Sequence, residues 1–252
     1  MKLFKDAFWL VKMEYKQQWL AVILTFMMCL IFGLFIGTAL SGYTSLQIEV
    51  NSTSIKSYFL DFMFIGLAPS FATLSMAKPY TSYRAAKLDP YGKRMAVLRS
   101  LPIPVSVLAL SRTLFMLCTL IIMSFAFFGG MTVIALMFSG NFFEWLTVGE
   151  YIIFVIVWFG FMLTVGGLNP YVEYGMRGKM LHFIPFVYIG LVVILEIIFF
   201  VSFNQGVVES ILKLIKNYGW TVAFVSILIG MVSCYEWNKI LKRRLAKRDF
   251  II

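Results

Sequence analysis

Apolar residues along this chain gather in six long runs, separated by short polar or basic segments. An α-helix rises about 1.5 Å per residue and the hydrocarbon layer of a bilayer is about 30 Å thick, so one crossing needs about 20 apolar residues. The runs have this length, and they lack the alternation of apolar and polar positions that marks barrel strands. The sequence therefore predicts an all-α polytopic membrane protein, with one domain over residues 1–252. The six predicted transmembrane helices are Leu20–Gly42, Ser57–Ala77, Thr113–Phe138, Val148–Leu168, Leu181–Phe203 and Gly219–Asn238.

The segment before the first run, residues 1–19, has the period of an amphipathic helix. Lys2, Lys5, Lys12 and Lys16 cluster on the flank of an apolar stripe. We expect an interfacial helix whose apolar side enters the bilayer and whose lysines meet anionic lipid headgroups. A protein contact through its other side is the alternative. The apolar stripe consists of Phe4, Ala7, Phe8, Val11, Tyr15 and Trp19.

Composition and charge give these runs an orientation. The chain is 61% hydrophobic and only 13% charged, which excludes a water-soluble globule. Its net charge of +10 lies between the runs: nineteen Lys and Arg fall in the segments on one side of the predicted membrane and three in those on the other. By the positive-inside rule both termini are cytoplasmic, including the basic tail 239–252. The excess of bases thus indicates membrane lipids as partners and no nucleic acid.

Sequence signals for catalysis are missing from the chain. One histidine and three scattered cysteines predict no metal site and no disulfide framework. The motifs of P-loop ATPases, zinc proteases and serine hydrolases do not occur. We therefore expect a chain that is not an enzyme and binds no cofactor of its own.

The most informative connection is Lys78–Arg112. Asp89 and Pro90 read as an N-cap and a first helical residue, and Leu101 precedes the proline that ends the element. This predicts a short cytoplasmic helix with apolar residues on one face and bases elsewhere. It is either a charged loop helix that obeys the positive-inside rule or a helix that receives a push from a soluble partner. The apolar residues are Tyr91, Met95 and Leu98, and the bases are Lys93, Arg94 and Arg99.

The segment Leu98–Pro104 (LRSLPIP), entering an apolar run through Ser111 and Arg112, resembles the motif before the third span of bacterial ABC exporter permeases that lack their own nucleotide-binding domain. The layout of the whole chain is similar to theirs. The resemblance implies that two permeases, identical or sister subunits, assemble in the cytoplasmic membrane with two ATPase subunits that hold ATP and Mg. It also implies that Asp89–Leu101 is the coupling helix on the ATPase. The expected coupling residues are Asp89, Pro90, Tyr91, Lys93, Arg94, Met95, Leu98, Arg99 and Leu101.

The implied function is outward transport of an amphipathic or lipophilic substrate, such as a peptide, an antibiotic or a lipid-like molecule, by alternating access. Two alternatives remain. A membrane sensor, scaffold or immunity protein would use its basic segments only to hold topology. A secondary transporter would carry inverted repeats and midplane charges, which the sequence does not show clearly.

Several residues inside or beside the runs are candidates for a part in transport or assembly. Asp61 and Glu196 lie in predicted spans, where a carboxylate facing lipid is costly, so they are candidates for the pathway. The alternative for Asp61 is that it reaches water at the nearby outer boundary, and for Glu196 that it makes a structural hydrogen bond. A spacing of four places Gly33, Gly37 and Ser41 on one face, suited to helix packing or a subunit interface. Between the last two runs, an outer amphipathic helix carries the apolar residues Val208, Ile211, Leu212 and Ile215. The resemblance to exporter permeases implies that this helix forms a lid over the exit. The alternative is a helix that rests on the outer leaflet.

Overall fold

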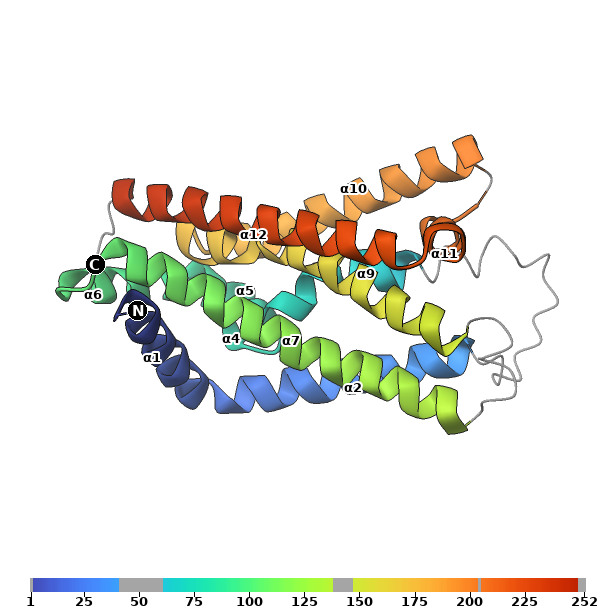
Figure 1. Cartoon of the computed structure of the whole chain (residues 1–252). Helices are drawn as coiled ribbons and strands as arrows, with labels where there is room; N and C mark the ends of the chain where they lie inside the picture. Colours follow the sequence, from blue (N-terminus) through green and yellow to red (C-terminus); the bar gives the residue numbers. More distant parts are fainter. Residues whose placement is uncertain (1, 41–60, 138–146, 204, 249–252) are drawn as a thin grey trace.

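The computed structural model describes residues 2–40, 61–137, 147–203 and 205–248. Within these ranges the regular structure is entirely helical, with ten α-helices and three short 3-10 or π segments. Five α-helices are long and apolar enough to cross a bilayer, as expected of a multi-pass membrane protein (Figure 1). They are α2 (Trp19–Leu40), α7 (Val105–Met137), α9 (Val148–Gly166), α10 (Met180–Phe203) and α12 (Trp220–Lys247).

The shorter helices mark the two ends of the bundle. The amino terminus of α1 (Lys2–Gln17), the carboxyl end of α12 and α6 (Pro90–Ser100) lie together at one end, called here the α6 end (Figure 1). The opposite end carries α11 (Val207–Tyr218) and is called the α11 end. Two further short helices, α4 (Lys78–Thr81) and α5 (Tyr83–Lys87), precede α6.

The long helices extend beyond two of the predicted spans. α7 begins at Val105 rather than Thr113, and α12 continues to Lys247 rather than ending at Asn238. An apolar run marks only the part of a helix suited to lipid, whereas the hydrogen-bond ladder continues through polar residues with good helix propensity. The basic tail is therefore helical up to Lys247, and residues 249–252 lie outside the described ranges.

The second predicted span, Ser57–Ala77, is not one regular helix. Its described part contains a π segment, η1 (Phe62–Gly66), and a 3-10 segment, η2 (Ala68–Ala72), and Thr73 is extended. Pro69 has no N–H with which to continue a helical ladder. The Ser70 hydroxyl in turn donates to the Leu67 carbonyl at 2.6 Å, a local bond that competes with regular helix. The described part of the second predicted span is thus not a regular α-helix, and five of the six predicted spans correspond to helices that are long and apolar enough to cross a bilayer.

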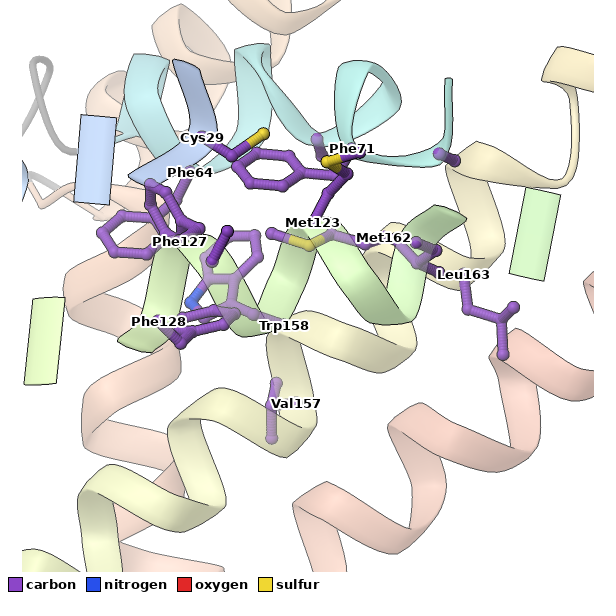
Figure 2. Packing of buried hydrophobic residues seen from close by; sticks show 14 of the residues in the cluster. Cys29, Phe64, Phe71, Met123, Phe127, Phe128, Val157, Trp158, Met162 and Leu163 are labelled. Atoms are coloured by element: carbon purple, nitrogen blue, oxygen red, sulfur yellow. The ribbon is translucent and has the colours of Figure 1, made fainter. Parts of the chain in front are cut away.

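The broken segment lies inside the bundle because its aromatic side chains enter the core. Phe64 stacks on Trp158 of α9 with ring centroids 5.4 Å apart, and it meets Phe127 of α7 edge to face. Phe71 packs on the same Phe127 ring at 4.9 Å. Figure 2 shows this cluster, which draws its side chains from α2, η1, η2, α7 and α9. These contacts position a segment that has little regular backbone of its own.

Candidate functional site

The helix α6 has the bounds and the caps that the sequence predicts. It spans Pro90–Ser100, with Asp89 as N-cap and Leu101 as an extended C-cap. The Asp89 carboxylate accepts a hydrogen bond from the Gly92 N–H at 3.1 Å. Asp89 itself has a φ of +48°, the left-handed conformation that aspartate tolerates better than most residues. The tight turn at Asp89 thus sets the direction in which α6 begins.

The apolar face of α6 packs against its own chain. Met95 is fully buried and Tyr91 nearly so, and Leu98 is partly buried against the same cluster. The cluster also contains Leu108 of α7 and Leu241 of α12. Tyr91 and Met95 therefore do not offer a surface to a partner, which corrects the expectation for these two residues. The outward side of α6 carries Lys93, Val97 and Leu101, and the last two are 57% and 48% exposed.

A buried carboxylate, Glu14 of α1, joins four elements of the α6 end. Its side chain is 1% exposed and forms ion pairs with Arg112 of α7 and with Arg94 of α6, the latter at 2.8 Å. The Tyr174 hydroxyl donates to Glu14 at 3.2 Å and accepts from Arg112 at 2.8 Å. Tyr174 belongs to η3 (Tyr171–Gly175), the π segment that follows α9. Charge-assisted hydrogen bonds of this kind are about twice as strong as neutral ones, so Glu14 holds α1, α6, α7 and η3 together.

Aromatic side chains extend this network toward α4. The Arg112 guanidinium lies over the Tyr174 ring, 4.6 Å from its centroid, and the Tyr91 and Tyr174 rings meet at 5.3 Å. The Tyr80 hydroxyl donates to the buried carboxylate of Glu173. Burial, reinforced by the charge of Glu173, raises the pKa of Tyr80 and of Tyr91 well above the ordinary value of tyrosine. Tyr80 therefore keeps its proton and stays a donor throughout the physiological pH range.

Arg248, directly after α12, contacts both ends of α6. The Arg248 guanidinium pairs with Asp89 at 2.8 Å and donates to the carbonyls of Tyr174 and Met176 at 2.7 and 2.8 Å. The Arg248 carbonyl accepts a hydrogen bond from Arg99, in the last turn of α6, at 2.8 Å. Because one residue contacts the N-cap of α6, its last turn and η3, α6 is bound to the final long helix as well as to α1 and α7.

The two carboxylates predicted for the pathway lie away from this network, toward the α11 end. Asp61 is buried and accepts hydrogen bonds from the N–H groups of Val207 and Val208, both at 2.7 Å, so it caps the start of α11. Glu196 is partly buried on α10, and one of its oxygens has no hydrogen-bond partner among the described residues. A role in a pathway stays a prediction for both.

The remaining predicted residues take part in packing. An added Cβ at Gly33 would lie 2.1 Å from the Phe127 carbonyl oxygen, and one at Gly37 would lie 2.8 Å from Ile134, so this glycine face lets α2 approach α7. Ser41 lies outside the described residues. On α11, Val208 and Ile215 are buried, while Ile211 and Leu212 are partly buried against the core. A lid function for α11 stays a prediction.

Sequence reasoning missed Glu14, Glu173, Tyr174 and Arg248. A signal was present for part of the network, because Arg112 stands at the start of a long apolar run and needs a buried acceptor if it enters the bundle. The identity of that acceptor depends on tertiary packing: Glu14 and Arg112 are 98 residues apart.

The buried charges of the α6 end, Glu14 and Arg112, are paired with one another, and the hydroxyls of Tyr80 and Tyr174 donate hydrogen bonds to carboxylates. Among the residues that the structure describes, no group of three or more His, Cys, Asp or Glu side chains is arranged to hold a metal ion. Comparisons of the chain with protein-family models, with curated proteins and with solved structures give no match.

Proposed function

We propose that this chain is the membrane-spanning half of an ATP-driven exporter, on which a separate cytoplasmic ATPase acts through α6. In this proposal the α6 end is cytoplasmic, the chain pairs with a second permease subunit, and ATP and Mg are bound by the partner ATPase. The substrate is amphipathic or lipophilic and moves outward by alternating access. The function follows from the arrangement of α6 and from the sequence resemblance of Leu98–Pro104.

The observation that carries the proposal is the buried attachment of α6. Arg94 and Asp89 link it to Glu14 of α1 and Arg248 of α12, and Glu14 binds Arg112 of α7. A helix held only by a flexible loop would absorb a push from a partner. The Glu14–Arg112 pair is buried, and its separation is costly because each charge would be left without its partner in a low-dielectric interior. A displacement of α6 would therefore move α1, α7 and the end of α12 together.

A mobile element suited to alternating access is also present. α10 has only two fully buried residues, Leu181 and Val192, and it contains Pro185 inside its helix. Most of its large apolar side chains face outward. An element with few buried contacts needs little free energy to change its position. In the proposal, α10 and the broken segment η1 and η2 move against the bundle when α6 is displaced.

The surface offered to the ATPase is the outward side of α6. It is called here the docking face and consists of Lys93, Val97 and Leu101, together with Leu88 just before the helix, which is 61% exposed. Exposed apolar side chains beside a base fit a partner with an apolar pocket and acidic rim. In the proposal the docking face, rather than the buried residues Tyr91 and Met95, contacts the ATPase.

Copurification tests the proposal directly. The tagged chain, solubilised gently from cells that express its neighbouring genes, is expected to carry a stoichiometric P-loop ATPase. The double variant V97D/L101D places two charges on the docking face and is expected to release that ATPase without unfolding the chain. A matched control, L214D, puts a charge on an exposed apolar position of α11 at the other end and is expected to retain it. The absence of an ATPase, or its retention by V97D/L101D, would contradict the proposal.

A further inference from the structure

A partly open cavity of about 230 Å³ lies between the broken segment, α9 and α10. Apolar side chains from all three elements form most of its wall, among them Leu67, Val165, Leu168 and Ile184. Pro69 and Pro185 also line it. Apolar cavities of about 150 Å³ in protein interiors stay dry and take up hydrocarbon such as benzene, so this one has room for a longer piece of chain.

Five of the six polar side chains on the wall donate hydrogen bonds to acceptors within the protein, and the sixth is Ser75. A water molecule in a cavity needs two to four polar partners, and a polar ligand needs free donors or acceptors. These five hydroxyl and amide groups donate to backbone carbonyls or to a carboxylate, and the lining that remains is mostly apolar. The pairs are Ser70 to Leu67, Thr73 to Ser70, Asn169 to Pro69, Tyr188 to Ile65, and Tyr80 to Glu173.

Two exposed lysines lie close in sequence to residues of the cavity wall. Lys78 begins α4 and lies two residues before the wall residue Tyr80. Lys179 directly precedes α10 and lies two residues before the wall residue Leu181. The helices α4 and α10 contact one another, so the two segments that carry these lysines are neighbours. An apolar cavity whose wall segments also carry ammonium groups matches a molecule with a hydrocarbon chain and an anionic head.

We propose that this cavity binds one acyl chain of an acidic phospholipid from the surrounding membrane, with its headgroup held by Lys78 and Lys179. This site goes beyond the proposed transport function and does not depend on it. It also gives α10 a ligand contact at the face where its contacts with the bundle are few. The hydrogen bond from Tyr188 to the Ile65 carbonyl, 2.7 Å long, closes the wall on that side.

Photolabelling of the full chain tests the acyl-chain site. The protein is reconstituted in nanodiscs that contain phosphatidylglycerol with a diazirine in one acyl chain, irradiated, and mapped by mass spectrometry. Label is expected at wall residues such as Leu67, Val165 and Ile184 in excess of that at outward positions of α10 such as Phe186 and Val201. V165W fills the cavity and is expected to lower this labelling severalfold. I194W adds the same side chain to an exposed position of α10 and is expected to leave it unchanged.

The role of the two lysines in binding the headgroup is tested by a change of lipid headgroup and by substitution of each lysine. The preference for phosphatidylglycerol over the matching phosphatidylcholine is expected to fall about fivefold for each of K78Q and K179Q. An unchanged preference would overturn the assignment of the headgroup to these lysines. Labelling that V165W does not reduce, or that equals the labelling of the outward face of α10, would mean surrounding lipid only and would overturn the site. The unfolding temperature of each variant, measured in parallel, shows that a loss of label is not a loss of fold.

Discussion

At the scale of single residues, the pair Glu14 and Arg112 carries the largest electrostatic interaction of the α6 end. Both side chains are almost fully buried, at 1% and 2% exposure. Removal of a charge from water costs several kcal/mol even after relaxation, and a buried pair offsets this cost only when further hydrogen bonds satisfy both partners. Tyr174 and Arg94 supply those bonds to Glu14, and the Tyr174 hydroxyl accepts one from Arg112, whose Nε has no hydrogen-bond partner among the described residues. The two charges are therefore far more costly apart than together.

The variant E14Q is expected to lower the free energy of unfolding by about 3–5 kcal/mol, because it leaves the Arg112 guanidinium buried without its counterion. A thiol-reactive dye can follow unfolding on heating in mild detergent, since Cys29 and Cys234 are buried free thiols. E236Q serves as the matched control, because Glu236 is half-exposed and pairs with Lys239 at the surface. An E14Q protein with the unfolding temperature of the wild type would contradict the role assigned to this pair.

The double variant E14L/R112L separates the energetic from the structural part of this interaction. Replacement of a buried ion pair by apolar residues of similar size is often neutral or stabilising, so the double variant is expected to recover most of the stability that E14Q loses. It is also expected to lose the link from Arg94 of α6 to the bundle. A double variant less stable than E14Q would show that the pair is needed for folding itself.

At the scale of elements, close approach of helix backbones determines how the long helices pack. Gly33 of α2 faces the backbone of Phe127 on α7, where an added Cβ would meet the carbonyl oxygen at 2.1 Å. A similar contact joins α9 and α12, since a Cβ at Gly160 would lie 2.4 Å from the Ser226 hydroxyl. Within a bilayer no hydrophobic effect drives helices together, because lipid tails are as apolar as the side chains. Small residues at the crossings let the helices approach closely and so increase their van der Waals contact.

The variant G33A is expected to destabilise the chain by about 1–3 kcal/mol, because α2 must move away from α7 to admit the methyl group. G129A on α7 is a matched control: nothing lies within 4 Å of the position its Cβ would take. It is expected to be neutral or to gain up to about 1 kcal/mol from helix propensity. Thermal unfolding with the thiol dye compares the two, and equal effects would contradict the proposed contact between α2 and α7.

The helix α11 depends on a capping residue that is remote in sequence. Asp61 accepts from the N–H groups of Val207 and Val208, the first two residues of α11. D61A is expected to cost about 1–2 kcal/mol of local stability, the usual effect of a lost N-cap. Hydrogen exchange of the amides in 207–212 should therefore become faster. E209A, which removes an exposed side chain of α11, is the control, and equal exchange in both variants would contradict the cap.

The sequence predicts those elements whose bounds depend on local features such as caps, prolines and apolar periodicity. It does not predict contacts between residues that are far apart along the chain. Asp89, Pro90 and Pro102 gave the bounds of α6, and the apolar positions of α11 gave its period. The buried side of α6 was misassigned, because Tyr91 and Met95 form an apolar face equally suited to a partner or to the chain's own core. Pro69 by itself indicates only that the helical hydrogen-bond ladder is interrupted there. The π and 3-10 turns around it depend on aromatic contacts of Phe64 and Phe71 with α7 and α9.

At the scale of the whole molecule, the basic charge and the buried ion network meet at the same end. The structure brings Lys93 on α6 and the basic carboxyl-terminal part of α12 to the α6 end, whereas α11 lies at the other (Figure 1). The positive-inside rule assigns the end rich in Lys and Arg to the cytoplasm. If that assignment holds, the docking face of α6 is accessible to a soluble ATPase and α11 lies where an exported molecule would leave.

The orientation can be measured with single cysteines and a membrane-impermeant thiol reagent. In a background where Cys29, Cys118 and Cys234 are replaced by serine, K213C on α11 is expected to react in intact cells. K93C on α6 is expected to react only after the membrane is permeabilised, because the positive-inside rule assigns its side of the bilayer to the cytoplasm. Both lysines are exposed, so a difference in labelling reports the side of the membrane rather than burial in the protein. The reverse pattern would place α6 outside the cell, where no ATP is available, and would exclude the proposed ATPase partner along with the direction of transport.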